Sequence, residues 1–563
     1  MNSTTTAPTT PPAAASNTAP TAPAGTPTTP PTTPPAAAPG PALPSAPGTP
    51  YADALRAQAG LDWLRLNVPG HAADPQGRHA LAALLGPDAL RLDFPPLLDG
   101  IDLGASSPLG EALALAAEAW GARRTWFLTN GASQGNQIAS LVAPALGRVL
   151  VVQRSVHSSV VDGLVLSGLD CAFVQPSVDA DQGIAHGVTA ADLARTLAEH
   201  PDAAAAWVVS PSYFGAVADV SALAEAAHAA GVPLIVDEAW GSHFGFHPAL
   251  PGNALSQGAD LVTSSTHKLA GSLTQSAMLH LGHGPFADRL EPLVDRAFRL
   301  VQSTSASALL MASLDVARAS LVAGRTAVGA SVAAADAVRG LIRGRGRYRL
   351  VSDSFGRFPD IVAADPLRVA VDTRSGGIPG HEARRLLHQD HRIMVEVATD
   401  SAIVAVVGAG AAPDADRFVE ALHRLPAAPA GAAADERSRL RLPPPGPARL
   451  TAREAFLSRT RTVPAREAVG MVSADTLAAY PPGIPNVLPG EVVTAEVVDF
   501  LQRTAAAPGG HVRGALDPAV SRLRVVTGEP PADAGDSAGP ADSGNSAGPA
   551  DSADSADSAA GGR

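Results

Sequence analysis

The sequence has almost no lysine. Of its 41 lysine and arginine residues, 40 are arginine, and Lys268 is the only lysine. A guanidinium group keeps its proton up to about pH 12, whereas a lysine amine can lose its proton and attack a carbonyl carbon. Arginine therefore serves wherever a positive charge is enough, and Lys268 is the candidate for amine chemistry. The alternative is that a single lysine remains by chance in an arginine-rich sequence.

Other absences exclude several classes of protein. Cys171 is the only cysteine, so no internal disulfide can form, which fits a reducing compartment. No apolar run reaches the roughly 18 residues of a membrane helix, and no basic segment followed by an apolar stretch begins the chain. The net charge of −12 argues against nucleic acid or an anionic membrane as a partner. We expect a cytoplasmic protein without a metal ion.

Composition divides the chain into segments. The first 50 residues are almost entirely Ala, Pro, Thr, Gly and Ser, and the last 35 repeat Ala-Asp-Ser and Ala-Gly-Pro units. Such segments bury too little apolar surface to fold, so we expect both to be disordered. The expected organisation is a disordered arm (1–50), an N-terminal segment (51–105), a large domain (106–320), a small α/β domain (321–425), a linker (426–447), a C-terminal domain (448–528) and a disordered tail (529–563).

The large domain alternates strand-length apolar runs with helical stretches. One helix is expected over Ser221–Ala230, with Ser221 as its N-cap and Gly231 just past its end. Strands that are apolar throughout and alternate with helices predict an α/β fold with a mainly parallel sheet, whose ligands bind at the carboxyl ends of the strands. The expected strands are Thr125–Leu128, Arg148–Val152, Ala206–Val209, Pro233–Val236, Asp260–Thr263 and Ala277–Leu281.

Two of these strands end in motifs that suit an aldehyde cofactor. Lys268 closes the motif Ser264-Ser265-Thr266-His267-Lys268, where its amine can form an imine and the hydroxyls can bind a phosphate; the alternative is a solvated loop lysine. Asp237 follows Pro233–Val236 and can bond the protonated pyridine nitrogen that pyridoxal needs as an electron sink. The small Ala239 lets a planar ring approach the backbone. An acid in this place is otherwise often a helix cap.

Two more motifs follow strands. Thr129–Gly135 joins a strand to a helix, and the backbone N–H groups at such a helix start bind anions, so we interpret it as a phosphate cradle. Its letters GASQG also fit the nucleophile elbow of α/β-hydrolases, with Ser133 as the nucleophile. His157 follows Arg148–Val152 and could stack on a cofactor ring, although a histidine there is more often a structural hydrogen-bonding group.

Taken together, the motifs resemble the Orn/Lys/Arg decarboxylase family, within the fold type I (aspartate-aminotransferase-like) pyridoxal-phosphate enzymes. The similarity extends over about residues 61–505, and the STHK and YPPGIP motifs are together highly specific. The matching stretches are Val68–His71, Phe127–Asn136, His157–Gly168, Pro211–Gly215, Val236–Pro248, Ser265–His280, Glu467–Gly470, Tyr480–Pro485 and Leu488–Glu491.

The resemblance implies a role for each motif residue. Lys268 would form the Schiff base with pyridoxal 5′-phosphate, Asp237 would bond its pyridine nitrogen, and His157 would stack on its ring and assist proton transfer. The phosphate would be held by Ala132, Ser133 and Ser265, with His267 beside the lysine. The family further implies decarboxylation of arginine, lysine or ornithine to a polyamine or its precursor, in a homodimer or larger homo-oligomer with active sites at the subunit interface.

Several positions depart from the family pattern and leave the substrate open. Ala72 replaces the usual Lys after PGH, Arg91–Leu103 lacks the usual Asp-Thr-Glu-rich run, and Ser303–Ser307 replaces Thr-Ser-Pro-Ser. The resemblance is to the short members of the family, which have no N-terminal receiver-like wing domain. Trp240 stands where these short members often have His. Glu467 is the first candidate to bind the distal cation of a basic substrate, unless it pairs with a surface arginine. Other possibilities are a different pyridoxal-phosphate enzyme, such as an aminotransferase or a tailoring enzyme, and a non-catalytic homologue.

Overall fold

The computed structural model describes residues 48–73, 80–427, 442–480, 484–507 and 510–528. The predicted tail, all but the last three residues of the predicted arm, and most of the predicted linker lie outside these ranges. None of the described helices is by itself long and apolar enough to cross a membrane. One pair of helices, α11 (Ala308–Ala323) and α12 (Arg325–Arg345), passes that test of length and composition only when taken together, and the pair is bent by 82°.

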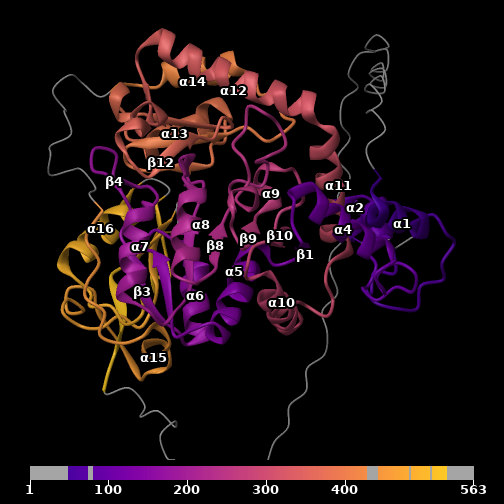
Figure 1. The fold of residues 1–563 in the computed structure, drawn as a ribbon. Helices are drawn as coiled ribbons and strands as arrows, with labels where there is room; N and C mark the ends of the chain where they lie inside the picture. The colour runs from indigo at the N-terminus through magenta and orange to yellow at the C-terminus, as the bar shows by residue number, and fades with distance from the viewer. Residues whose placement is uncertain (1–47, 74–79, 428–441, 481–483, 508–509, 529–563) are drawn as a thin grey trace, which may run out of the picture. The chain divides into compact units, whose positions relative to one another are not determined.

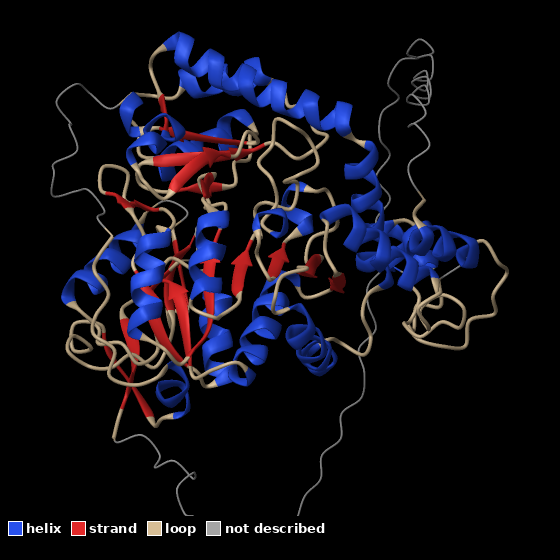
Figure 2. Cartoon of the chain, in the orientation of Figure 1, coloured by secondary structure: helices blue, strands red, loops and turns tan. Residues whose placement is uncertain are grey.

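A seven-stranded sheet in the order β1-β10-β9-β8-β6-β2-β3 forms the centre of the large domain (Figure 2). The strands from β9 to β3 are parallel, whereas β10 is antiparallel to both of its neighbours. The mainly parallel sheet is therefore as predicted, with β3 as a strand that the apolar pattern did not indicate. The strands are β1 Arg124–Leu128, β2 Val149–Gln153, β3 Asp170–Val174, β6 Ala203–Val209, β8 Leu234–Asp237, β9 Leu261–Ser264 and β10 Ala277–Leu281.

Helices cover both faces of this sheet (Figure 1). Along β2, Leu150 and Val152 belong to one apolar core, and Val149 and Val151 belong to another. Successive strand residues point to opposite faces, which explains why a fully buried strand is apolar at every position. The first core includes residues of α5 (Gly131–Val142), α6 (Ser158–Ser167) and α10 (Ala287–Val301), and the second includes residues of α7 (Ala190–Glu199) and α8 (Val220–Ala229).

The small domain has a four-stranded antiparallel sheet in the order β11-β13-β15-β14. The C-terminal domain has its own apolar core, which includes Val497 and Leu501 of its longest helix. The elements of the small domain are α12 Arg325–Arg345, β11 Arg349–Leu350, β13 Arg368–Asp372, α13 Gly380–His391, β14 Val397–Ala398, β15 Ala402–Val406 and α14 Ala415–Arg424. Those of the C-terminal domain are α15 Ala452–Leu457, β16 Thr460–Pro464, β17 Leu477–Tyr480, β18 Pro485–Val487, α16 Ala495–Ala506, β19 His511–Arg513 and β20 Arg522–Val526.

Two segment boundaries differ from those expected from composition. The helix α1 (Pro50–Ala59) begins inside the predicted arm, and the Gly48 carbonyl accepts a hydrogen bond of 2.6 Å from Arg318. The expected boundary at residue 320 falls within α11 (Ala308–Ala323), and the chain bends at Gly324 instead. A helix boundary depends on local hydrogen bonds and packing as well as on composition, so composition alone does not mark where either helix begins or ends.

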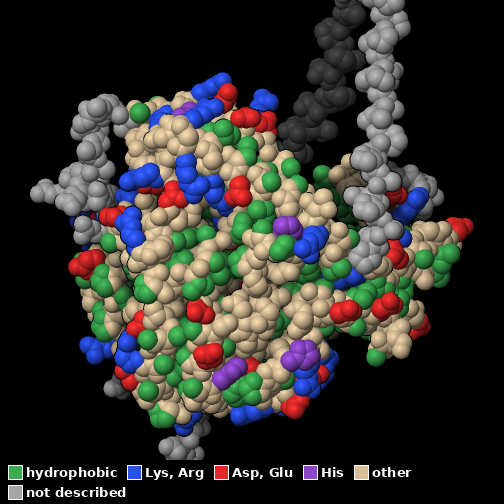
Figure 3. Space-filling model, turned by 45° about the horizontal axis from the view of Figure 1, so that its top comes forward, with side chains coloured by type: hydrophobic (Ala, Val, Ile, Leu, Met, Phe, Trp, Pro, Cys, Tyr) green, Lys and Arg blue, Asp and Glu red, His purple; other side chains and the backbone are tan. Residues whose placement is uncertain are grey.

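On the face shown in Figure 3, acidic and basic side chains are interspersed.

The remaining helices of the N-terminal segment are α2 Ala80–Leu85 and α3 Pro87–Leu92, followed by α4 Pro108–Trp120, which contacts α1 and β1. Tyr51 and Leu55 of α1 are buried, so the N-terminal segment is part of the folded structure from its first helix onward.

The helix α5 packs against the sheet so closely that a side chain at Gly135 has no room. A Cβ there would lie 2.6 Å from Cγ2 of Thr263 on β9. We expect Gly135→Ala to destabilise the protein by about 1–3 kcal/mol, because overpacking forces the helix away from the strand. Differential scanning calorimetry should show a lower melting temperature.

The matched control is Gly340→Ala in α12, where a Cβ would meet nothing within 4 Å. Alanine favours a helix over glycine by about 1 kcal/mol, so this variant should melt at a higher temperature. Equal melting temperatures for the two variants would contradict the packing argument.

Candidate active site

A cavity of about 450 Å³ lies at the carboxyl ends of the strands, where the fold predicts a ligand site. Its walls include residues that follow β1, β2, β8 and β9, together with residues of the small domain. The structure brings together all the predicted site residues except Glu467. Those that line the cavity are Ala132, Ser133, His157, Asp237, Ala239, Trp240, Ser265, His267 and Lys268.

Lys268 lies in the short helix α9 (Thr266–Leu269), directly after β9. Burial lowers the pKa of its amine to about 8; the Asp237 carboxylate opposes this shift, and the Arg368 guanidinium adds to it. The Nζ atom lies 3.9 Å from the centre of the Trp240 ring. A substantial fraction of the amine is therefore neutral near pH 7–8, as a nucleophilic lysine requires.

Asp237, the last residue of β8, is buried and held by two hydrogen bonds. It accepts one of 2.9 Å from Nδ2 of Asn136 and one of 3.0 Å from the backbone N–H of Ala239. The bond to Ala239 turns the chain so that this small residue also lines the cavity. The carboxylate is therefore fixed in direction, and a planar ring can lie close to the backbone that follows it.

His157 belongs to the same hydrogen-bond network as Asp237. Its Nδ1 accepts from the backbone N–H of Ser159 at 3.2 Å and lies 2.8 Å from the Ser159 hydroxyl. The second hydrogen of the Asn136 amide reaches that hydroxyl at 2.9 Å. Burial lowers the pKa of His157 to about 4, so the ring is neutral at pH 7 and carries its proton on Nε2. Asn136 is the residue that sequence reasoning missed here.

The first turn of α5 forms the end of the cavity expected to hold a phosphate. Gly131 begins the helix with φ +69°, and no side chain caps its N-terminus. The Gly131 N–H donates to the Gln275 carbonyl at 2.7 Å, so the N–H groups that follow it, those of Ala132 and Ser133, are the ones that suit an anion. Among the described residues no hydrogen bond joins Ser133 to His157, which bonds Ser159, or to His267, which bonds the Ser276 carbonyl at 2.8 Å, whereas the hydrolase alternative needs a histidine bonded to its serine.

Trp240 of the large domain lines the cavity and contacts the small domain. Its ring is contacted by Lys268 and by the Arg368 guanidinium, whose carbon also lies 3.9 Å from the ring centre. Arg368 comes from β13 of the small domain and donates to the carbonyl oxygens of Tyr213 and Trp240 at 2.7 and 3.4 Å. No sequence motif marked Arg368, because the two carbonyl groups that place it at the cavity lie 128 and 155 residues away.

Of the two residues predicted to bind the substrate, Trp240 lines the cavity and Glu467 does not. Glu467 is exposed and lies outside the cavity of its own chain. The cavity instead includes Glu396, an exposed residue of the small domain that no motif indicated. Among the described residues, no group of three or more His, Cys, Asp and Glu side chains is arranged to hold a metal ion.

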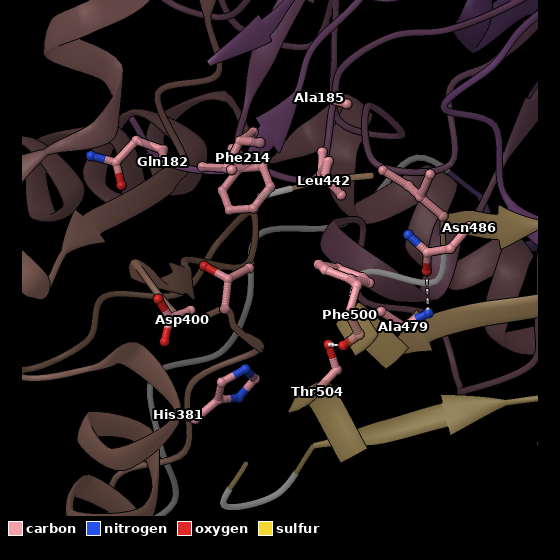
Figure 4. A pocket seen from close by; sticks show the side chains of 14 residues that line it. Gln182, Ala185, Phe214, His381, Asp400, Leu442, Ala479, Asn486, Phe500 and Thr504 are labelled. Atoms are coloured by element: carbon pink, nitrogen blue, oxygen red, sulfur yellow. Dashed lines mark hydrogen bonds between the residues drawn. The ribbon is translucent and has the colours of Figure 1, made fainter. Parts of the chain in front are cut away.

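A second cavity, of about 70 Å³, lies where the large, small and C-terminal domains meet (Figure 4). Phe214 and Phe500 give it apolar walls, and His381 and Asp400 lie on one side. It is lined by none of the predicted site residues. The chemistry predicted from the sequence therefore belongs to the larger cavity.

Comparison with known proteins agrees with this geometry. The arginine decarboxylase of Bacillus subtilis is 33% identical over 482 residues, which cover 84% of this chain and 96% of that protein. The arginine decarboxylase of Halalkalibacterium halodurans is 34% identical over 485 residues, with coverages of 82% and 94%. The crystal structure of the Francisella novicida lysine decarboxylase has the same fold, with a TM-score of 0.71 at 20% identity over 85% of this chain and 81% of that one.

Two family models also match. Residues 49–355 match the major domain of the Orn/Lys/Arg decarboxylases, and residues 445–509 match their C-terminal domain. The first match alone includes more than half of the chain. The chain therefore belongs to the Orn/Lys/Arg decarboxylase family.

Proposed function

We propose that this protein is a pyridoxal-phosphate-dependent decarboxylase of a basic amino acid, and that arginine is its substrate. The observation that carries the proposal is a single cavity that contains a lysine amine of lowered pKa, a fixed carboxylate and an uncapped helix start. The family membership and the relatives named arginine decarboxylase support the reaction and the choice of arginine.

The residues present fit pyridoxal 5′-phosphate. When bound, this cofactor supplies an electron sink for the bond that breaks at the substrate Cα. Lys268 offers the amine for its aldehyde, Asp237 offers a carboxylate for its pyridine nitrogen, and the first turn of α5 offers N–H donors for its phosphate. His157, neutral and with its proton on Nε2, can hold a proton close to the reacting atoms.

The charges of the cavity favour decarboxylation over transamination. Among the described residues that line it, Lys268 and two histidines are the only basic side chains, and no arginine is present. The Arg368 guanidinium packs against the Trp240 ring and donates to backbone carbonyls, so no guanidinium among the described residues lines the cavity to hold a substrate carboxylate. A poorly solvated carboxylate gains by leaving as neutral CO₂. An aminotransferase, which returns its substrate carboxylate intact, gains nothing from this arrangement.

The reaction is tested by measuring CO₂ release from arginine, lysine and ornithine. Arginine should give the highest kcat/KM. Asp237→Ala should lower kcat at least about a hundredfold, because an unprotonated pyridine is a poor electron sink. Transfer of the amino group to a keto acid, without CO₂, would assign the protein to the aminotransferase alternative. Retained cofactor absorbance without any turnover would favour the non-catalytic one.

Cofactor attachment is tested on Lys268 directly. Pyridoxal 5′-phosphate added to cofactor-free protein and reduced with borohydride should add its mass to the peptide that contains Lys268. The attachment rate should rise with pH around a midpoint of about 8, because the neutral amine reacts, rather than around the roughly 10.4 of a free lysine. Lys268→Arg is the control and should gain no mass there. An unmodified Lys268 peptide in the wild type would contradict the cofactor assignment.

Glu467 remains the first candidate to bind the guanidinium of arginine, and its exposed position means that it would have to act on the cavity of a partner subunit. Glu467→Gln should lower kcat/KM for arginine by a factor of about 30 or more, because a desolvated cation loses its charged partner. The modification of Lys268 should be unchanged.

The control for this variant is Glu496→Gln, an equally charged and exposed residue of the same domain. Mixing Glu467→Gln with Lys268→Ala protein should restore part of the activity, because one site of a hybrid dimer then has both groups intact. An unchanged kcat/KM for Glu467→Gln, or no recovery on mixing, would exclude Glu467 from this role.

A further inference from the structure

The turn Leu488–Glu491 of the C-terminal domain, the LPGE motif, is attached to the large domain near the active site. Glu491 is buried and accepts two hydrogen bonds, of 3.0 and 3.2 Å, from Nη2 of Arg154. The same guanidinium donates to the Pro485 carbonyl at 2.9 Å, and the Leu488 N–H donates to Glu491 at 2.9 Å. Arg154 is the first residue after β2, so this contact fixes the start of the loop that leads to His157.

A second contact holds the other end of the same loop. Arg513, on β19 of the C-terminal domain, donates to the hydroxyl of Ser158 and reaches Asp162 at 3.4 Å. Both partners lie on α6, whose N-cap is His157. The C-terminal domain therefore contacts the chain three residues before His157 and again directly after it.

The bond between Arg154 and Glu491 is not explained by stability alone. A buried ion pair loses about as much hydration energy as it gains in attraction, and an apolar pair of the same size often stabilises a fold equally well. What the ion pair adds is a fixed geometry, because the planar guanidinium is held at both terminal nitrogens, Nη1 by the Pro485 carbonyl and Nη2 by the Glu491 carboxylate. The residue placed by that geometry is His157, which lines the cofactor cavity.

We propose that the C-terminal domain sets the position of His157 through Glu491 and Arg513, which act as positioning residues for the reaction. The proposal deepens the proposed function and rests on it for the role of His157. A small displacement of a catalytic group is enough to slow a reaction about a hundredfold. The two contacts give the C-terminal domain a function in catalysis although neither Glu491 nor Arg513 lines the cavity.

The charges around His157 provide a readout that a purely structural role would not change. Three charged groups face the imidazole: Asp237 from β8, Lys268 from α9 and Arg513 from β19. Burial lowers the pKa of His157 most; Asp237 opposes this, and the two cations add to it. Removing the charge of Arg513 should therefore raise the pKa of His157, and the acidic side of the kcat/KM profile should move to higher pH.

The test compares Arg513→Ala with Arg524→Ala in the full-length holoenzyme. The two arginines are matched, because their side chains are 47% and 43% exposed and both bond a carboxylate, but Arg524 pairs with Asp475 inside the C-terminal domain. We expect Arg513→Ala to lower kcat at least tenfold with KM changed less than about twofold. Arg513→Lys should recover part of the loss, and Arg524→Ala should behave as the wild type.

Glu491→Gln provides a second variant, measured by amide hydrogen exchange of the peptide around residues 154–162. Exchange there should be faster in Glu491→Gln and Arg513→Ala than in the wild type and Arg524→Ala. Wild-type kcat, pH profile and exchange in both variants would overturn the proposal. Because exchange needs no turnover, a wild type without decarboxylase activity would refute the proposed function while the exchange result still decides whether the C-terminal domain fixes this loop.

Discussion

The active site depends on one constraint, which is that an amine and a carboxylate are buried at the ends of two adjacent parallel strands. Asp237 ends β8 opposite Thr263 of β9, and Lys268 follows β9 by one short turn. Parallel strands end at the same edge of a sheet, so the two side chains reach the same cavity without any special loop. Burial then lowers the pKa of the amine, and the nearby carboxylate keeps the shift from becoming larger.

Thr263 connects this pair to the end of the cavity that is proposed to hold a phosphate. Thr263 pairs with Asp237 of the adjacent strand β8. Its side chain packs against the helix α5 so closely that only glycine fits at position 135. The N-terminus of α5 is therefore placed by the same strand that leads to Lys268. Helix, amine and carboxylate form one rigid arrangement, as a site that must orient a planar ring requires.

The sequence was sufficient for the features that are local. Apolar runs, several of them followed at once by a polar motif, predicted every strand of the central sheet except β3, together with the fold and the motifs that meet at the cavity, and the predicted family is confirmed by the comparisons. Asn136 and Arg368 were missed because their roles come from contacts across 101 and 128 residues, which no local pattern records. The residues next to the expected arm boundary are likewise held by a distant group, since the Gly48 carbonyl is bonded by Arg318.

The difference between lysine and arginine has a physical consequence at Trp240. Two cations contact this indole ring, Lys268 and Arg368. Burial lowers the pKa of both, to about 8 for the amine and about 10 for the guanidinium, with Asp365 opposing the shift of the latter. Near pH 8 the lysine is thus partly neutral, while the arginine keeps its charge and by repulsion favours the neutral amine further. With the proposed aldehyde cofactor in the cavity, a lysine in place of Arg368 would be a second amine beside the Trp240 ring, so the two positions require different residues.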